Sequence, residues 1–136
     1  MSVLNVAFAQ TNPVVGDVEH NLELILSAAS EVADRADVII TGELALSGYP
    51  MGDLSYRADI IESSMTALKK LIAATCEQTY SNLVFVVGHI SPAAASKATA
   101  QSSLAIAHNS ASVISNGELI GTYHKQTLPN YGVFDD

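Results

Sequence analysis

The chain has 136 residues, of which 49% are hydrophobic and 15% charged, a composition typical of one globular domain with a buried core and not of a disordered tail. Fourteen acidic residues against six basic ones give a formal net charge of -8, and most of the acidic residues precede residue 63. Such a surface repels phosphate backbones and anionic lipids, so we expect neither nucleic acid nor membrane among the partners.

Cysteine usage and the N-terminus indicate the compartment. The sequence holds one cysteine, Cys76, which cannot form an internal disulfide and so fits a reducing compartment. The N-terminus, MSVLNVAFAQ, has no basic flank and only a short apolar run, unlike a secretory signal, and no stretch approaches the length of a membrane span. We therefore predict a cytoplasmic protein.

The first part of the chain predicts a βαβ unit. Residues 3–9 form an apolar run bounded by turn-forming residues, which is typical of a buried strand. Asp17 stands at an N-cap position and apolar residues then recur at helical spacing, so we expect a helix over residues 18–35. The β-branched run at 38–41 does not alternate with polar residues, which favours a central parallel strand covered on both faces.

The remainder predicts a second helix and then a β-meander. An apolar stripe after a glycine-rich loop indicates a helix over residues 58–80. Asn116-Gly117 is the strongest two-residue hairpin signal in the chain. The expected strands are 83–88, 104–108, 112–115 and 118–124. We therefore predict an α/β fold in which a βαβαβ unit is followed by a β-meander.

Glu43 is a candidate proton-transfer group because it follows the strand at 38–41 by two residues. Ligands of open α/β sheets bind at the carboxyl ends of the strands, and a carboxylate partly withdrawn from water there can shuttle a proton. The alternative is an ordinary loop acid, and position alone does not decide between the two.

Lys125 closes the last predicted strand and is a candidate for stabilising negative charge. A fixed ammonium there can face an oxyanion that develops on a substrate carbonyl. The alternative is an edge-strand charge that discourages aggregation, which is the better interpretation of the lysine on its own.

The other reactive side chains form no clear site. Cys76 continues the apolar stripe of the second predicted helix, so we expect it in the core as a small hydrophobe and not as a nucleophile. The four histidines share no metal-ligand spacing, and neither GxxxxGK nor GxGxxG is present, so we predict no metal site and no common phosphate-binding loop.

Three aromatic residues lie in predicted loops beside the two candidates: Tyr49, Tyr131 and Phe134. Aromatic rings with a polar end suit small-ligand pockets, but such side chains also cover core edges.

Three segments carry a family resemblance: FAQTNPVVGDVEHN at 8–21, GELALSGYPMGDL at 42–54 and YHKQTLPNYGVFDD at 123–136. Together they resemble the nitrilase-type glutamine amidotransferase domain at the N-terminus of glutamine-dependent NAD synthetases. The resemblance implies a four-layer αββα sandwich, of which residues 1–136 are the N-terminal part. It also implies glutamine as the substrate and a Glu-Lys-Cys triad as the catalytic machinery.

The resemblance assigns roles by motif position. Glu43 corresponds to the general base and Lys125 to the oxyanion-stabilising cation, while Tyr49, Tyr131 and Phe134 match positions around the glutamine pocket. Gly42 departs from the proline that relatives usually have before this glutamate, and glycine loosens the backbone that aims the carboxylate.

A second departure concerns the nucleophile. In the family the catalytic cysteine follows a further strand beyond the lysine motif, and the 136 residues end before such a strand. We therefore expect this chain to be inactive on glutamine by itself. The ATP-dependent synthetase domain is absent from the sequence, so ATP, Mg²⁺ and deamido-NAD are not expected to bind here.

With half of the implied sandwich absent, apolar faces need another cover, and we predict a homo-oligomer. The preferred hypothesis is a fragment of a glutamine-dependent NAD synthetase that keeps the amidase fold without its activity. The alternatives are a non-catalytic binding domain and a flavodoxin-type binding protein, although the second of these does not explain the meander or the terminal motif.

Overall fold

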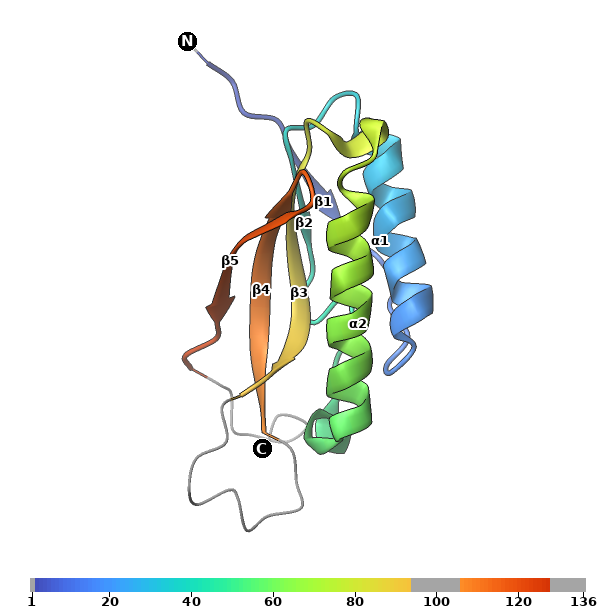
Figure 1. The fold of residues 1–136 in the computed structure, drawn as a ribbon, viewed down its shortest axis with the longest axis vertical. Helices are drawn as coiled ribbons and strands as arrows, with labels where there is room; N and C mark the ends of the chain where they lie inside the picture. Colours follow the sequence, from blue (N-terminus) through green and yellow to red (C-terminus); the bar gives the residue numbers. More distant parts are fainter. Residues whose placement is uncertain (1, 94–105, 128–136) are drawn as a thin grey trace.

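The computed structural model describes residues 2–93 and 106–127. They form one five-stranded sheet with two α-helices packed on the same side of it (Figure 1). Two short 3-10 helices, Gly52–Tyr56 and Gln78–Tyr80, lie in the connections. The main elements are β1 (Val6–Ala9), α1 (Val18–Val32), β2 (Val38–Thr41), α2 (Ala58–Ala74), β3 (Val84–Pro92), β4 (Ala107–Ser115) and β5 (Glu118–His124).

The sheet has the strand order β1-β2-β3-β4-β5, the same as the order along the chain. The first three strands are parallel and connected by α1 and α2, while β3, β4 and β5 are antiparallel neighbours. The βαβαβ unit followed by a β-meander is therefore confirmed. The turn between β4 and β5 is the predicted hairpin, with positive φ angles at both Asn116 (48°) and Gly117 (77°).

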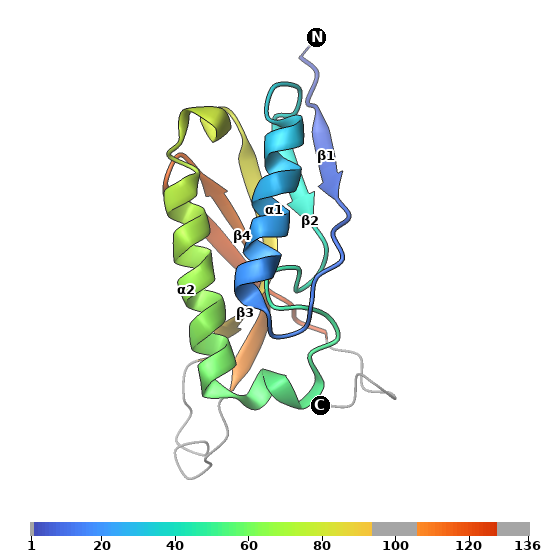
Figure 2. The ribbon, with the colours of Figure 1, turned by 90° about the vertical axis from the view of Figure 1, so that its right-hand side faces the viewer.

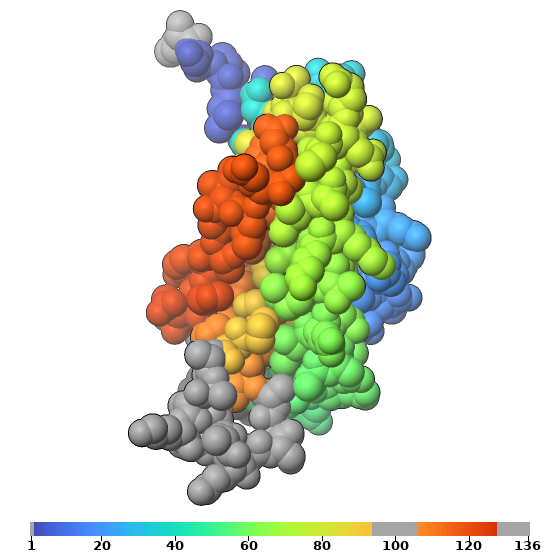
Figure 3. Space-filling view, in the orientation of Figure 1, coloured from blue at the N-terminus to red at the C-terminus, as the bar shows by residue number. Residues whose placement is uncertain are grey.

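The helix ends differ from the predictions. The side chain of Asp17 caps α1 by accepting the backbone N–H of His20, as predicted, but α1 ends at Val32, three residues early. The helix α2 ends at Ala74 and not at 80. The hydroxyl of Thr75 accepts the backbone N–H of Gly117 at 2.8 Å, so the tip of the β4–β5 hairpin lies against the end of α2 (Figure 3).

The early end of α2 corrects the placement of Cys76. We expected this residue on the apolar stripe of the helix, but it lies beyond the helix and is exposed. Its sulfur lies against Gly117, where any Cβ would overlap it. Thr75 occupies the buried position instead. Cys76 is therefore a surface thiol at the hairpin end of the sheet.

The strands β3 and β4 are longer than predicted, whereas β5 has its predicted ends. β3 continues to Pro92, and β4 is one strand and not two. The small and polar residues of β4 are held in register by β3 and β5 on either side, with Asn109 opposite Ile90 and Ala111 opposite Tyr123. Pairing with neighbours on both sides outweighs the low strand propensity of this segment.

The core lies between the sheet and the two helices. On this covered face Ile39, Phe85, Val87 and Ile114 are at most 1% exposed. The rings of Phe85 and Tyr80 pack edge to face with centroids 5.7 Å apart. One face of β1 to β4 therefore contributes to a single core, with α1 and α2 as its other wall (Figure 2).

In the part of the chain that the structure describes, no helix covers the opposite face of the sheet, which we call the open face. Its side chains include Val6, which is 42% exposed, Phe8 at 73% and Tyr123 at 63%. The prediction that β2 is covered on both faces was wrong for the described residues, because Ile39 is buried whereas Val38 and Ile40 on the open face are only partly covered.

Candidate functional site

The site begins where β2 ends, at the carboxyl edge of the parallel strands. Glu43 lies in the loop after β2, which turns tightly at once: the backbone N–H of Gly48 donates to the carbonyl of Leu44 at 2.7 Å. Leu44 has a positive φ of 52°, and Gly48 one of 95°. Gly48 packs so close to the backbone of Val15 that any Cβ would overlap it. This turn and the close packing of Gly48 against Val15 therefore fix the backbone of the loop that carries Glu43.

Gly88 of β3 supports this loop from the neighbouring strand. Its N–H donates to the hydroxyl of Thr41 at 3.0 Å, and its carbonyl accepts the N–H of Leu46, also at 3.0 Å. A Cβ at this position would overlap the carbonyl oxygen of Gly42 and the backbone nitrogen of Leu44. A glycine is required here so that the Glu43 loop can lie against β3.

Asn21 of α1 ties this loop to the one after β1. Its side chain is fully buried, accepts the N–H of Val14 at 2.8 Å, and donates to the carbonyls of Val14 and Leu46. The two loops are the opposite walls of one cleft, so a buried amide on a helix sets their separation.

Lys125 reaches Glu43 from the other end of the chain. It directly follows β5, and its Nζ donates to Oε1 of Glu43 at 2.7 Å. The two side chains are 35% and 40% exposed, so the pair is partly shielded from water. The hydrogen bond from the ammonium to Glu43 raises the pKa of Lys125 above its ordinary value, which favours the charged form of the lysine.

Asn109 of β4 contacts both members of this pair, and sequence reasoning did not single it out. Its side-chain Nδ2 donates to the same Oε1 of Glu43 at 2.5 Å, and its backbone carbonyl accepts the N–H of Lys125 at 2.8 Å. A polar residue in a strand is unremarkable in a single sequence, and only the fold brings it to a carboxylate 66 residues away.

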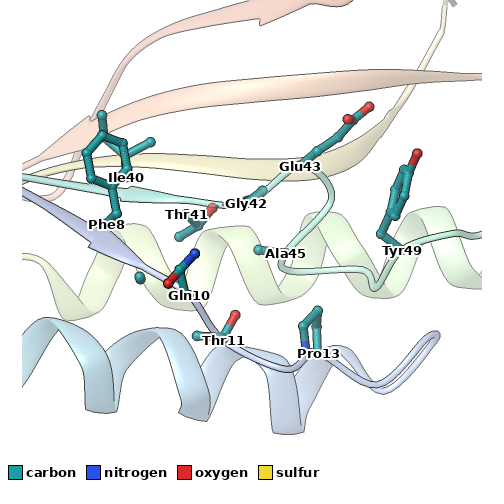
Figure 4. A pocket seen from close by; sticks show the side chains of 11 residues that line it. Phe8, Gln10, Thr11, Pro13, Ile40, Thr41, Gly42, Glu43, Ala45 and Tyr49 are labelled. Atoms are coloured by element: carbon teal, nitrogen blue, oxygen red, sulfur yellow. Dashed lines mark hydrogen bonds between the residues drawn. The ribbon is translucent and has the colours of Figure 1, made fainter.

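Of the three predicted pocket residues, Tyr49 lies at the site. It lines a cleft of about 520 Å³ together with Glu43. Figure 4 shows the Glu43 carboxylate and the Tyr49 hydroxyl projecting from the loop after β2 toward the same side. Tyr49 also lies near enough to Lys125 to contribute to its raised pKa. Tyr131 and Phe134 lie outside the described residues.

The cleft joins the open face of the sheet. Its other lining residues come from β1, the following loop and β2, and they include Phe8, Gln10, Pro13 and Ile40 (Figure 4). A shallower depression of about 260 Å³ on the other side of Glu43 is lined by Asn109, Tyr123 and Lys125. Glu43 thus stands between two hollows at the edge of an apolar surface.

Two further positions that the sequence analysis singled out, Cys76 and Gly42, add no functional group to the site. Cys76 is at the hairpin end of the sheet and Glu43 at the end where β2 finishes, so Cys76 cannot act on a substrate held by Glu43. At Gly42 the space for a Cβ is empty, so packing does not demand glycine there.

In the described ranges no three His, Cys, Asp or Glu side chains group in a way that could hold a metal ion, and no helix is long and apolar enough to cross a membrane.

Comparison with known proteins defines the class. The model of the carbon-nitrogen hydrolase family matches residues 5–135, so the chain belongs to that family. An amidase from Nesterenkonia sp. shares the fold, with a TM-score of 0.69 over 95% of this chain and 44% of its own, at 20% identity.

Within that family the similar proteins are glutamine-dependent NAD(+) synthetases. The one from Xylella fastidiosa (strain Temecula1 / ATCC 700964) is 37% identical over 98% of this chain. The solved structure from Acinetobacter baumannii, in complex with ADP, has a TM-score of 0.74 over 97% of this chain at 31% identity. The chain spans about a fifth of these relatives, 22% of each.

Proposed function

We propose that these residues form part of a glutamine-hydrolysing domain that supplies ammonia for NAD synthesis, with Glu43 and Lys125 as two members of its catalytic triad. The observation that carries the proposal is the 2.7 Å contact between Lys125 Nζ and Glu43 Oε1, which joins groups 82 residues apart at the carboxyl edge of the sheet. The similarity to glutamine-dependent NAD(+) synthetases supports glutamine as the substrate.

The two groups have distinct tasks in this proposal. The Glu43 carboxylate takes the proton of an attacking thiol and later gives it to the departing ammonia. The Lys125 ammonium, whose pKa the hydrogen bond to Glu43 raises, stabilises the negative oxygen of the tetrahedral intermediate. Tyr49 lines the cleft in which the glutamine side chain is held, and Tyr131 and Phe134 are proposed to contribute to the same pocket.

The thiol is proposed to come from polypeptide other than these 136 residues. Cys76 is the only cysteine of the sequence, and it lies at the far end of the sheet. ATP, Mg²⁺ and deamido-NAD are likewise proposed to bind outside this chain. The 136 residues therefore carry the base and the cation of the reaction without its nucleophile.

A glutamine titration followed by NMR tests the binding part of the proposal. Backbone signals of Glu43 and Tyr49 are expected to shift, and Lys125→Met is expected to abolish those shifts. Lys70→Met is the matched control, because Lys70 forms a comparable exposed ion pair with Glu19 at 2.6 Å on the helices. Unchanged spectra at millimolar glutamine, or equal shifts in the Lys125→Met variant, contradict the proposal.

A glutaminase assay tests the catalytic part. The purified chain is expected to release no glutamate from glutamine, and Cys76→Ala is expected to make no difference. Release of glutamate that disappears in Cys76→Ala would show that the exposed thiol acts as the nucleophile, contrary to its position.

The open face supports a second element of the proposal, a homo-oligomer in which another copy of the chain covers Phe8 and Tyr123. Exposed apolar patches of this kind are typical of interaction surfaces. Light scattering after size-exclusion chromatography is expected to show a dimer or larger species that Phe8→Asp dissociates. A stable wild-type monomer at micromolar concentration would argue against it.

A further inference from the structure

Asn109 contacts both members of the proposed pair, through two different groups. Its side-chain amide donates to Glu43 at 2.5 Å, and its backbone carbonyl accepts the N–H of Lys125 at 2.8 Å. The side chain therefore acts on the carboxylate, while the backbone fixes the start of the lysine segment. The two contacts can be altered separately, because a substitution removes only the first.

Glu43 and Asn109 lie in different kinds of element. Glu43 is in a loop, whereas Asn109 is in β4, paired with Ile90 of β3, and so belongs to a strand with neighbours on both sides. An amide anchored in the sheet can hold a loop carboxylate in one orientation without adding a charge.

The oxygen that receives these bonds is the same in both cases. Lys125 Nζ and Asn109 Nδ2 both donate to Oε1 of Glu43. A carboxylate held by two donors on one oxygen is fixed in rotation, and it presents its other oxygen to a proton donor.

We propose that Asn109 is a positioning residue that holds Glu43 against Lys125 and fixes which carboxylate oxygen acts as the base. The inference about the base rests on the proposed function. The coupling between Asn109, Glu43 and Lys125 does not, so it can be measured without glutamine and without activity.

The reactivity of the Lys125 amine reports this coupling. Acetic anhydride acylates only the neutral amine, so the rate at about pH 9 rises when the ion pair with Glu43 loosens and the pKa of Lys125 falls. Acylation is measured site by site with mass spectrometry, and Lys69 serves as internal reference. Asn109→Ala is expected to speed acylation of Lys125 by about two- to fivefold. Asn116→Ala, at the other end of the same hairpin, is expected to leave it unchanged.

A double-mutant cycle separates positioning from a structural role. If Asn109 acts through the carboxylate, Asn109→Ala has no further effect on Lys125 in a Glu43→Gln background. A rise of the same size in that background, or no rise in the wild-type background, overturns the proposal. Asn109→Val, which lacks the donor but favours strands, replaces the alanine variant if that one folds poorly, as judged by circular dichroism.

The outcome is distinguishable from failure of the proposed function. If the chain does not bind glutamine but Asn109→Ala still speeds acylation of Lys125 through Glu43, Asn109 remains the positioning residue of the pair. Only the proposed glutamine-hydrolysing function is then rejected. If the chain binds glutamine but shows no coupling between Asn109, Glu43 and Lys125, the proposed function stands and the positioning role of Asn109 is rejected.

Discussion

The two faces of the sheet differ in what covers them although both are apolar. Phe85 on the covered face is fully buried, whereas Phe8 on the open face is 73% exposed. Strands that are apolar on both sides carry no period-2 pattern, which is why the sequence indicates buried strands without saying where the cover comes from. The candidate site lies along the edge of the open face, so whatever covers that face also closes one side of the cleft.

Of the tests that compare the two faces, a matched pair of phenylalanine substitutions has the largest expected effect. Phe85→Ala is expected to lower the free energy of unfolding by about 3–5 kcal/mol, because it leaves a cavity in the core. Phe8→Ala is expected to change it by less than about 0.5 kcal/mol in the monomer. Urea denaturation at low protein concentration measures both. A large loss for Phe8→Ala would mean that the open face is already buried in solution.

Two glycines on neighbouring parts of the sheet allow a sharper test. Gly88→Ala is expected to cost about 1–3 kcal/mol, because the new methyl group must displace the backbone on both sides of Glu43. The same substitution should speed acylation of Lys125. At Gly121 of β5 the space for a Cβ is empty, so Gly121→Ala is the control. Equal effects of the two substitutions would refute the proposed support by Gly88.

The covered face also contains a buried imidazole, which makes the stability of the fold depend on pH. Burial lowers the pKa of His89, with a smaller contribution from nearby His124, and its Nε2 lies 2.8 Å from the Ser112 hydroxyl. As the pH falls below the ordinary histidine pKa, the unfolded chain takes up a proton that folded His89 resists, so this contribution to stability is present at higher pH and lost on acidification.

Stability is therefore expected to fall as the pH is lowered from about 7 to about 5. Urea denaturation across this range measures it, and His89→Gln is expected to flatten the slope even though it lowers stability at neutral pH. His20→Gln, on the exposed surface of α1, should leave the slope as it is. If His89→Gln also leaves the slope of stability against pH unchanged, a group other than His89 causes the pH dependence.

Local signals were enough to predict much of the fold. The strand Val38–Thr41 has both of its predicted ends, because a β-branched run is bounded there by Asp37 and Gly42. The start of α1 follows from the capping side chain of Asp17. The hairpin follows from Asn116-Gly117, whose backbone adopts the positive φ angles that such turns need. In each case the deciding interaction spans only a few residues.

The errors arise where a distant contact decides. The apolar spacing of α2 continues through Cys76, but the helix ends before it, where the hydroxyl of Thr75 accepts an N–H from a hairpin 42 residues away. Asn109 was missed for the same reason, since its amide meets Glu43 only after three strands have been placed side by side. The sequence therefore predicted both charged members of the site but not the neutral one between them.

The strand order has a consequence for how the protein is made. Because each new strand is added beside the preceding one, the sheet can grow at a single edge while the chain emerges from the ribosome. Along the chain the Glu43 loop and β3 come before Asn109 of β4, and Lys125 follows β5. The charged pair can therefore form only once all five described strands have been synthesised, and it joins a loop and a strand that the earlier elements position.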